Sequence, residues 1–534
     1  MHFTLWNCYI SELLLNFARK GSISTHKIYK LRMAKFSRAF WVANSVELLE
    51  RLAYYAVFIV LTLYLSNVWG FNDVQAGIIA GCFSALLYFL PTFVGAYSDR
   101  IGFRKAIMIA FTLLTIGYFS LGIIPTLLES AGLVSYGAGN AVGLNEEDPE
   151  KVSSVILTFR SFFDWMGVAN FDRFTEFTGL RGSAQQWAIV PILLFIVVGG
   201  AFIKSVISGT VARETTSETR ARGFAIFYMM VNIGAFTGKT VVDPLRKSIG
   251  DQGLVYLNYF SGTMTLIALI VVFFMYKSTH TAGQGKSLSE IWQALIKVCK
   301  NGRLVALILI TSGFWIVQQQ MYASMPKYVI RMVGEDASPG WIANVNPLVV
   351  FLLVNLVTTI MKKRSPLASI MVGMFIIPIS ALIMSLGNMM GGELIHFGDL
   401  FSIHPITLTL IIGIAFQALA ECFISPRFLE YFSLQSPKGE EGLYLGFSHL
   451  HSFVSSLVSF IVAGVLLDTF CPDPLSERFA NSTNFATDYA AATAHAHYLW
   501  YVFFAIGLVS AIALVIYGRV VKRIDERKQA GIQK

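Results

Sequence analysis

The stretch SVELLERLAYY, residues 45–55, places two acids and a base inside a segment that is otherwise apolar and long enough to span a bilayer. On an α-helix Glu47, Glu50 and Arg51 share one stripe, because residues three and four apart lie on the same face. A charged side chain in hydrocarbon costs several kcal/mol unless it is paired or faces a wet cavity. We therefore expect this stripe to face the interior of a helical bundle, where it is a candidate functional site.

The composition is typical of a membrane protein that crosses the bilayer many times. Of 534 residues, 55% are hydrophobic and only 14% are charged, which leaves too much apolar surface for a soluble protein. The net charge of +9 does not indicate nucleic-acid binding, because Lys and Arg lie between the apolar segments rather than on one face. The five cysteines are scattered without a CxxC pair, so neither a metal site nor a disulfide framework is expected.

Apolar segments of about 20 residues, the length that spans the hydrocarbon, recur along the whole chain. They fall into two sets of six separated by a polar break, which predicts an all-α membrane protein with two six-helix bundles and with both termini on one side. The expected spans are 40–66, 73–97, 104–126, 187–211, 222–244, 253–276, 303–331, 340–361, 367–389, 404–428, 442–467 and 494–518.

Basic residues gather in alternate loops, which the positive-inside rule assigns to the cytosol. We therefore expect a protein of the plasma membrane with both termini in the cytosol. Residues 1–34 show no cleavable signal pattern, and Met33 resembles an ordinary start. The expected division is a cytosolic tail at 1–39, a first bundle at 40–276, a cytosolic linker at 277–302, a second bundle at 303–518 and a cytosolic tail at 519–534.

Two stretches interrupt the regular spacing of the spans. Residues 127–186 form an insertion on the outer side, with a short amphipathic helix expected at 152–165 and no chemistry assigned to it. Within the linker, residues 287–296 begin with Ser287, a typical cap, and have helical apolar spacing. This pattern predicts an interfacial helix that tethers the two bundles.

The motif GAYSDRIGFRK, residues 95–105, has the GxxxDRxGxRK form found between the second and third helices of the major facilitator superfamily. Together with the layout of two six-helix halves, it resembles that superfamily, which implies a substrate site near the midplane between the halves. Gly95, Asp99 and Arg100 are then candidates for a conformational latch, because Asp99 can meet a helix end or basic groups.

A second set of motifs resembles the proton-dependent oligopeptide transporter family over residues 40–470. Glu47 to Arg51 match its ExxER motif, and Tyr54 and Tyr55 extend the match. Four further segments resemble the family's signatures in the expected helices: GGAFIK at 199–204, FAIFYMMVNIG at 224–234, NVNP at 344–347 and ECFISP at 421–426.

The charges of these motifs indicate a cavity with opposite poles. Arg51 and Lys204 are deep cations of the first half, and Glu421 is the deep acid of the second. A zwitterionic di- or tripeptide could place its carboxylate toward the cations and its ammonium toward Glu421. The family resemblance implies the same pose. It also adds further substrate-binding candidates, namely Tyr55, Tyr88, Asn232, Asn346 and Ser425.

The ExxER stripe also suggests how transport is coupled to protons. A deprotonated Glu47 or Glu50 can hold Arg51 or Lys204, and protonation frees a cation for the substrate carboxylate. The proton is then the coupling ion, and no cofactor is expected. The expected partners are short peptides and the lipid bilayer, without nucleic acid, and the carrier is expected to be a monomer.

Three positions depart from the family pattern. Phe58 stands where peptide transporters commonly carry a second base, Gln319 stands where an acid on helix seven is usual, and Ser448 stands near a common Trp. The main alternative is therefore a related carrier of another small solute, amino-acid-like, nitrate or another anion, with weak or no proton coupling. An enzyme is not expected, since the sequence has no HExxH or GxSxG motif. A receptor without transport is not favoured either, since no signalling domain follows the last span.

Overall fold

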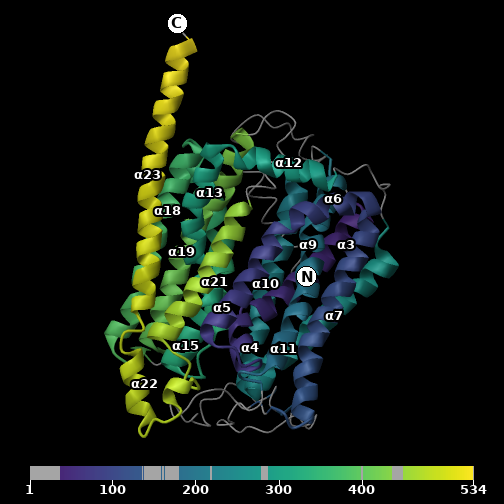
Figure 1. Ribbon diagram of the computed structural model, residues 1–534. Coiled ribbons are helices and arrows are strands. Elements are labelled where there is room, and N and C mark those ends of the chain that lie inside the picture. Colours follow the sequence, from purple (N-terminus) through teal and green to yellow (C-terminus); the bar gives the residue numbers. More distant parts are fainter. Residues whose placement is uncertain are drawn as a thin grey trace.

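The chain folds into two bundles of long helices that stand side by side (Figure 1). In this computed structural model, the described residues are 36–134, 136, 158, 161–162, 180–216, 219–277, 287–398, 401–435 and 449–532. Among them, 11 helices are long and apolar enough to cross a membrane, or up to 12 if a bent pair counts as one span. The prediction of an all-α membrane protein is thereby confirmed.

We use the name first bundle for the helices that precede α12 (Leu288–Cys299) and second bundle for the elements that follow it. The first bundle contains α3 (Arg38–Phe58), α4 (Leu61–Asn67), α5 (Asp73–Phe89), α6 (Pro91–Ile101), α7 (Phe103–Ser130), η2 (Ala184–Ala188), α9 (Ile189–Arg213), α10 (Arg220–Ile249) and α11 (Asp251–Met275). The expected helix at 152–165 lies almost wholly outside the described residues.

The second bundle ends in a long helix and carries a small hairpin between two of its spans. Its elements are α13 (Gly302–Gln318), α14 (Gln320–Ala323), α15 (Met325–Val333), α16 (Pro339–Ala343), α17 (Val345–Met361), α18 (Pro366–Leu386), η3 (Gly387–Met390), β1 (Ile395–Phe397), β2 (Phe401–Ile403), α19 (Pro405–Gln435), α21 (Leu450–Phe470), η4 (Glu477–Phe479), α22 (Phe485–Thr493) and α23 (Tyr498–Ile532). The strands pair antiparallel, with Ile395 opposite Ile403.

Several spans that were expected to be continuous are broken helices. Pro91 opens α6 and Pro326 lies in the first turn of α15, where each lacks the N–H that would continue the helix before it. The break between α3 and α4 has a different origin. There the Val60 N–H bonds the Val57 carbonyl three residues back, and the axis bends by 47°.

Broken helices expose backbone carbonyls, which must find donors because lipid offers none. Pro244 within α10 removes the donor for the Thr240 carbonyl, and the Trp341 indole of the second bundle donates to it at 3.2 Å. The Trp341 backbone N–H also donates to Asp243 at 2.9 Å. A proline in one bundle thus creates an attachment point for the other.

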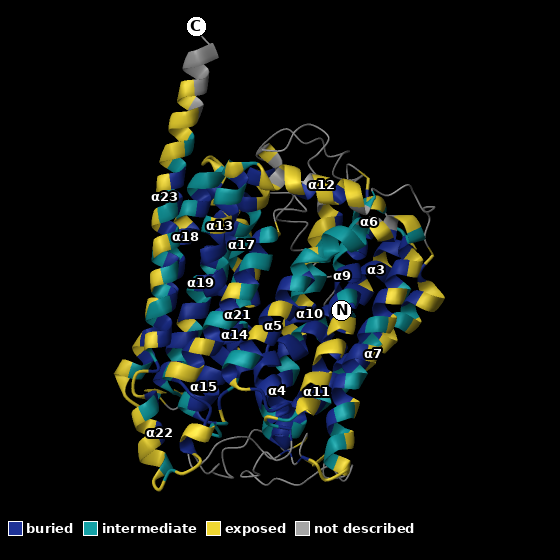
Figure 2. Ribbon diagram, viewed as in Figure 1, coloured by how far each residue is buried: buried dark blue, intermediate teal, exposed yellow. Residues whose placement is uncertain are grey.

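The two ends of the molecule differ in which elements they carry. At one end lie α12 and the projecting tip of α23, and at the other lie α4, α15 and α22 (Figure 1). We call the first end the linker face and the second the far face. Buried residues fill the middle of both bundles, whereas residues 522–524 of α23 are exposed (Figure 2).

A buried ionic cluster joins the bundles at the far face. Asp73 at the start of α5 lies 2.7 Å from Lys327 Nζ and 2.7 Å from Arg331 Nη1, both on α15. Lys327 also donates to Ser66 at 2.6 Å, and Arg331 donates to the Cys471 carbonyl at 2.7 Å. Since all these groups are buried, the cluster seals the far face.

Glycines bring the bundle backbones into direct contact beside this cluster. A Cβ on Gly77 of α5 would lie 2.4 Å from the Phe460 carbonyl oxygen of α21, and a Cβ on Gly464 would lie 2.5 Å from the Asp73 carbonyl oxygen. Real Cβ atoms do not come so close to a backbone oxygen, so only glycine permits this approach. We call this contact the glycine seam.

We predict that Asp73→Asn opens the far face. Removing one partner of a buried ionic group costs about 3–5 kcal/mol, because the remaining charges are left uncompensated. Cys471 is 0% exposed and lies against this cluster, so it reports the opening. In detergent, a variant that keeps Cys471 as its single cysteine should react with maleimide at least about tenfold faster when Asp73 is replaced.

The matched control is Asp488→Asn, which removes an exposed carboxylate from α22. It should leave the labelling rate of Cys471 unchanged. Equal labelling rates in the Asp73 variant and its parent would show that the seal does not depend on the ionic cluster.

Candidate functional site

The acidic and basic residues of the ExxER stripe form one buried ionic group on α3. Arg51 Nε lies 3.0 Å from Glu47 Oε1, and Arg51 Nη2 lies 2.5 Å from Glu50 Oε2. All three side chains are buried. Helical spacing alone explains the arrangement, because residues three and four apart share a face of the helix.

Lys204 of α9 adds a second cation to this group. Its Nζ donates to the Leu87 carbonyl at 3.2 Å, which is free because Pro91 lacks an N–H, and it lies 3.8 Å from the centroid of the Tyr88 ring. Lys204 therefore points into the bundle rather than toward the interface. Its charge interacts with those of Glu47 and Glu50. We call Glu47, Glu50, Arg51 and Lys204 the first-bundle charge group; with every member ionised, it carries no net charge.

Glu421 of α19 is held by amides of two other helices of the second bundle. Its Oε2 accepts from Gln318 Nε2 at 3.0 Å and from Asn346 Nδ2 at 3.1 Å. None of the ion pairs among the described residues includes Glu421. Gln318 was missed from sequence, although the run of three glutamines at 318–320 is an unusual polar signal inside a span.

Two tyrosines lie between the charged groups of the bundles. Tyr55 and Tyr88 each interact electrostatically with both Arg51 and Glu421. Both are partly exposed, as are Lys204 and Glu421. The predicted charges of the two bundles therefore face one another across a shared, accessible region.

The remaining substrate-binding candidates line the same region. Asn346 contacts Glu421 directly, whereas Asn232 donates its amide to its own helix at the Tyr228 carbonyl, 2.8 Å away. The Ser425 hydroxyl has no hydrogen-bond partner among the described residues. Asn232, Asn346 and Ser425 are all partly exposed, but the Ser425 hydroxyl oxygen itself is buried.

An aromatic layer closes this region toward the far face. The Phe58 ring lies 4.9 Å from that of Tyr54, 4.9 Å from that of Tyr322 and 5.9 Å from that of Phe460. Phe58 thus packs in the layer that joins the bundles, at the position where a second base is usual. Gln319, at the position of the usual acid, donates to Ser456 at 3.3 Å, so neither departure leaves an unpaired charge.

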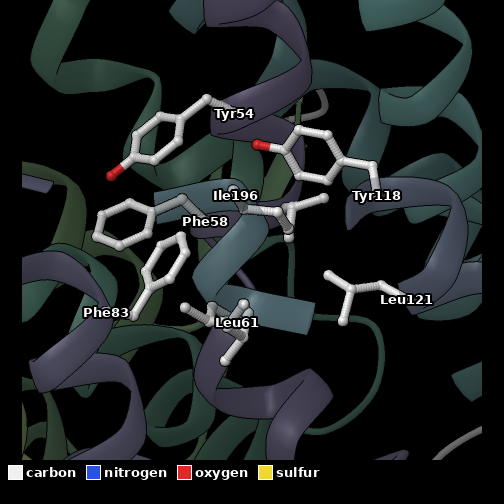
Figure 3. Close-up of a pocket in the computed structure, with 9 residues that line it drawn as sticks. Tyr54, Phe58, Leu61, Phe83, Tyr118, Leu121 and Ile196 are labelled. Carbon is white, nitrogen blue, oxygen red and sulfur yellow. The ribbon is translucent and has the colours of Figure 1, made fainter. Parts of the chain in front are cut away.

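A small cavity lies behind this layer, inside the first bundle (Figure 3). Tyr54, Phe58 and Tyr118 line it together with aliphatic side chains. Its volume of about 10 Å³ holds roughly one water, whereas ligand pockets measure about 300–1,000 Å³. The accessible region between the bundles, and not this cavity, is therefore the candidate substrate site.

The candidate latch lies apart from this site, at the linker face. Gly95 is part of α6, and a Cβ there would lie 3.2 Å from the Ser205 Cβ of α9. Arg100 is exposed. The side chain of Asp99 lies outside the described part of the chain, so the latch stays a prediction.

Comparison with known proteins agrees with the motifs. The sequence profile of the POT family matches residues 297–473. Dipeptide and tripeptide permease B of Shigella dysenteriae is 24% identical over 485 residues, which cover 83% of this chain and 90% of the permease.

Solved structures share the fold at low sequence identity. The crystal structure of peptide transporter POT in complex with sulfate is 16% identical, with a TM-score of 0.62 over 94% of this chain and 99% of that one. A structure of tetrameric PepTSo2 is 17% identical, with a TM-score of 0.60 over 92% of this chain and 99% of that one. The profile match, the permease relatives and the shared fold all agree with the family resemblance that the ExxER stripe and the other motifs carry.

Proposed function

We propose that the protein is a secondary transporter that carries di- and tripeptides together with protons by alternating access. The observation that carries this proposal is the pair of charged groups across the accessible region, with Arg51 and Lys204 on one bundle and Glu421 on the other. The names of the relatives, dipeptide and tripeptide permeases, support the same substrate class.

The peptide pose follows from the distribution of charge. The substrate carboxylate binds toward Arg51 and Lys204, where Tyr55 and Tyr88 flank it, and the ammonium binds toward Glu421. Asn232 and Asn346 hydrogen-bond the peptide backbone, because both are partly exposed in the same region, and the unpartnered hydroxyl of Ser425 joins them when the side chain turns toward the ligand. Each charge of the zwitterion thereby pairs with an opposite charge of the protein. Without the peptide, these charges of the protein have fewer partners than they could bind.

Proton coupling follows from the first-bundle charge group. Arg51 is engaged by both acids, so it is not available to a substrate carboxylate while both are ionised. Protonation of Glu47 or Glu50 releases part of that cation, and the peptide then takes the place of the acid. A charge that crosses 100 mV supplies about 2.3 kcal/mol, which exceeds the roughly 1.4 kcal/mol needed for a tenfold gradient.

The conformation supports the orientation that we propose. The ionic cluster and glycine seam close the far face, while the site residues remain partly exposed. The basic loops support placing the linker face in the cytosol, so this state is inward-facing, with both termini cytosolic in the plasma membrane. We further propose that Gly95, Asp99 and Arg100 latch the opposite state and that the carrier acts as a monomer.

We predict that purified protein in vesicles accumulates a labelled dipeptide when the outside is more acidic than the inside. Excess di-alanine should suppress this uptake, because it carries the same terminal charges. Nitrate at the same concentration should have no effect. Suppression by nitrate but not by di-alanine would instead identify a carrier of small anions.

We predict that Glu50→Gln uncouples transport without abolishing peptide binding. Gln fills the same space but does not ionise, so the variant should lose accumulation driven by a pH gradient, by about tenfold or more, and should retain exchange of internal for external peptide. Glu47→Gln should behave likewise.

The control for both variants is Glu526→Gln, which alters an exposed acid on α23 and should transport normally. Undiminished gradient-driven accumulation in both site variants would contradict the role assigned to these acids.

A further inference from the structure

One buried cation has no role in the mechanism above. Lys239 of α10 is 1% exposed and lies where the two bundles meet. Its Nζ donates to the Ala343 carbonyl of the second bundle at 3.3 Å. Pro347 lacks the N–H that would bond this carbonyl, so it is free to accept the ammonium. A backbone carbonyl of the second bundle thus binds the ammonium of a lysine from the first.

Aromatic rings complete the surroundings of this ammonium. Lys239 Nζ lies 5.4 Å from the centroid of the Tyr55 ring and 5.6 Å from that of the Tyr322 ring, distances at which ring faces attract a cation. A carbonyl and two rings stabilise positive charge but supply no negative charge. None of the ion pairs among the described residues includes Lys239.

The acid whose charge reaches Lys239 is Glu421. Lys239 donates to the carbonyl of Ala343, and Glu421 accepts from the amide of Asn346, three residues further along the same segment, so the two charges lie on one side of the joint between the bundles and attract each other. Asp243, one turn further along α10, is not an alternative, since it binds the Trp341 backbone N–H and interacts with the charge of Arg246. Because the first-bundle charge group is neutral by itself, Lys239 supplies the charge that balances Glu421.

We propose that Lys239 is the counter-charge of Glu421 and thereby sets the charge preference at the amino end of the peptide. This inference rests on the proposed peptide transport. A peptide ammonium at Glu421 lies in the field of Lys239, and little water screens that field because Lys239 is buried. A peptide whose first side chain is acidic therefore binds more tightly to the site, and a peptide whose first side chain is basic binds more weakly. Lys239 acts through Glu421 and the field, so it is a positioning residue.

The test compares three dipeptides that differ in the charge of the first side chain. Glu-Ala, Gln-Ala and Lys-Ala compete with labelled di-alanine for uptake into vesicles at one fixed pH. For the unmodified protein we expect Glu-Ala to compete about tenfold better than Lys-Ala, with Gln-Ala between them. In Lys239→Met this ratio should fall about tenfold, whereas Lys239→Arg should retain it.

A purely structural role makes a different prediction, because a packing defect weakens all three dipeptides alike and leaves their ratio unchanged. Lys239→Gln provides an independent variant in case Lys239→Met does not fold. It removes the same charge but keeps a polar side chain, so the preference for Glu-Ala over Lys-Ala should fall by about tenfold, as in Lys239→Met.

The outcomes separate this inference from the proposed function. If none of the dipeptides competes, peptide transport itself is wrong, and the inference fails with it. If all three dipeptides compete, but the ratio is the same in the unmodified protein, Lys239→Met and Lys239→Gln, transport stands and the role of Lys239 is overturned.

Discussion

Lipid offers no hydrogen-bond partner, so polar groups within the lipid-spanning part of this protein have to be bonded inside it. Because of this constraint, the prolines help to determine where charged side chains bind. Each proline in a helix frees a carbonyl four residues before it, and in lipid that carbonyl requires a donor. The donors come from neighbouring helices and include both lysines near the candidate site. Three such pairs are Leu87 with Lys204, Ala343 with Lys239, and Thr240 with Trp341. The positions of the prolines therefore determine which backbone carbonyls are free to bind a cationic side chain.

As a result of these contacts, the charges of the two bundles are balanced in different ways. The first-bundle charge group is balanced internally, so in the proposed mechanism it takes up a proton together with a substrate carboxylate without creating a net charge. Glu421, in contrast, is bonded by two amides and is balanced only at a distance. The acid that we propose receives the substrate ammonium is thus oriented by two hydrogen bonds but is not in an ion pair, which suits a group that has to bind and release a ligand in each cycle.

The sequence was sufficient for the features that depend on local spacing. The spans and the ExxER stripe follow from hydrophobic length and helical periodicity, which are properties of contiguous residues. The direction of Lys204 also agrees with its expected place in the site. The broken helices were missed, because a proline shows where a helix can break but not whether neighbouring donors will stabilise the break.

Contacts between the bundles were beyond such reasoning. Asp73 and Lys327 are separated by 254 residues, and the local sequence around neither residue predicts that the other is its partner. Lys239 lies toward the end of its span, where a lysine usually extends to the interface. Its burial depends on a carbonyl of a helix 104 residues away. The role of Gln318 likewise could not be predicted, since its contact with Glu421 arises from tertiary packing.

At the far face, the glycine seam determines the shape of the contact between the bundles, and other interactions determine its strength. Where Gly77 and Gly464 meet the opposite backbone, the glycines themselves carry no side chain that would have to change rotamer when the helices part. Resistance to parting then comes mainly from the neighbouring ionic cluster. Substitutions in that cluster can therefore adjust the speed of the transport cycle while the shape of the closed joint stays the same.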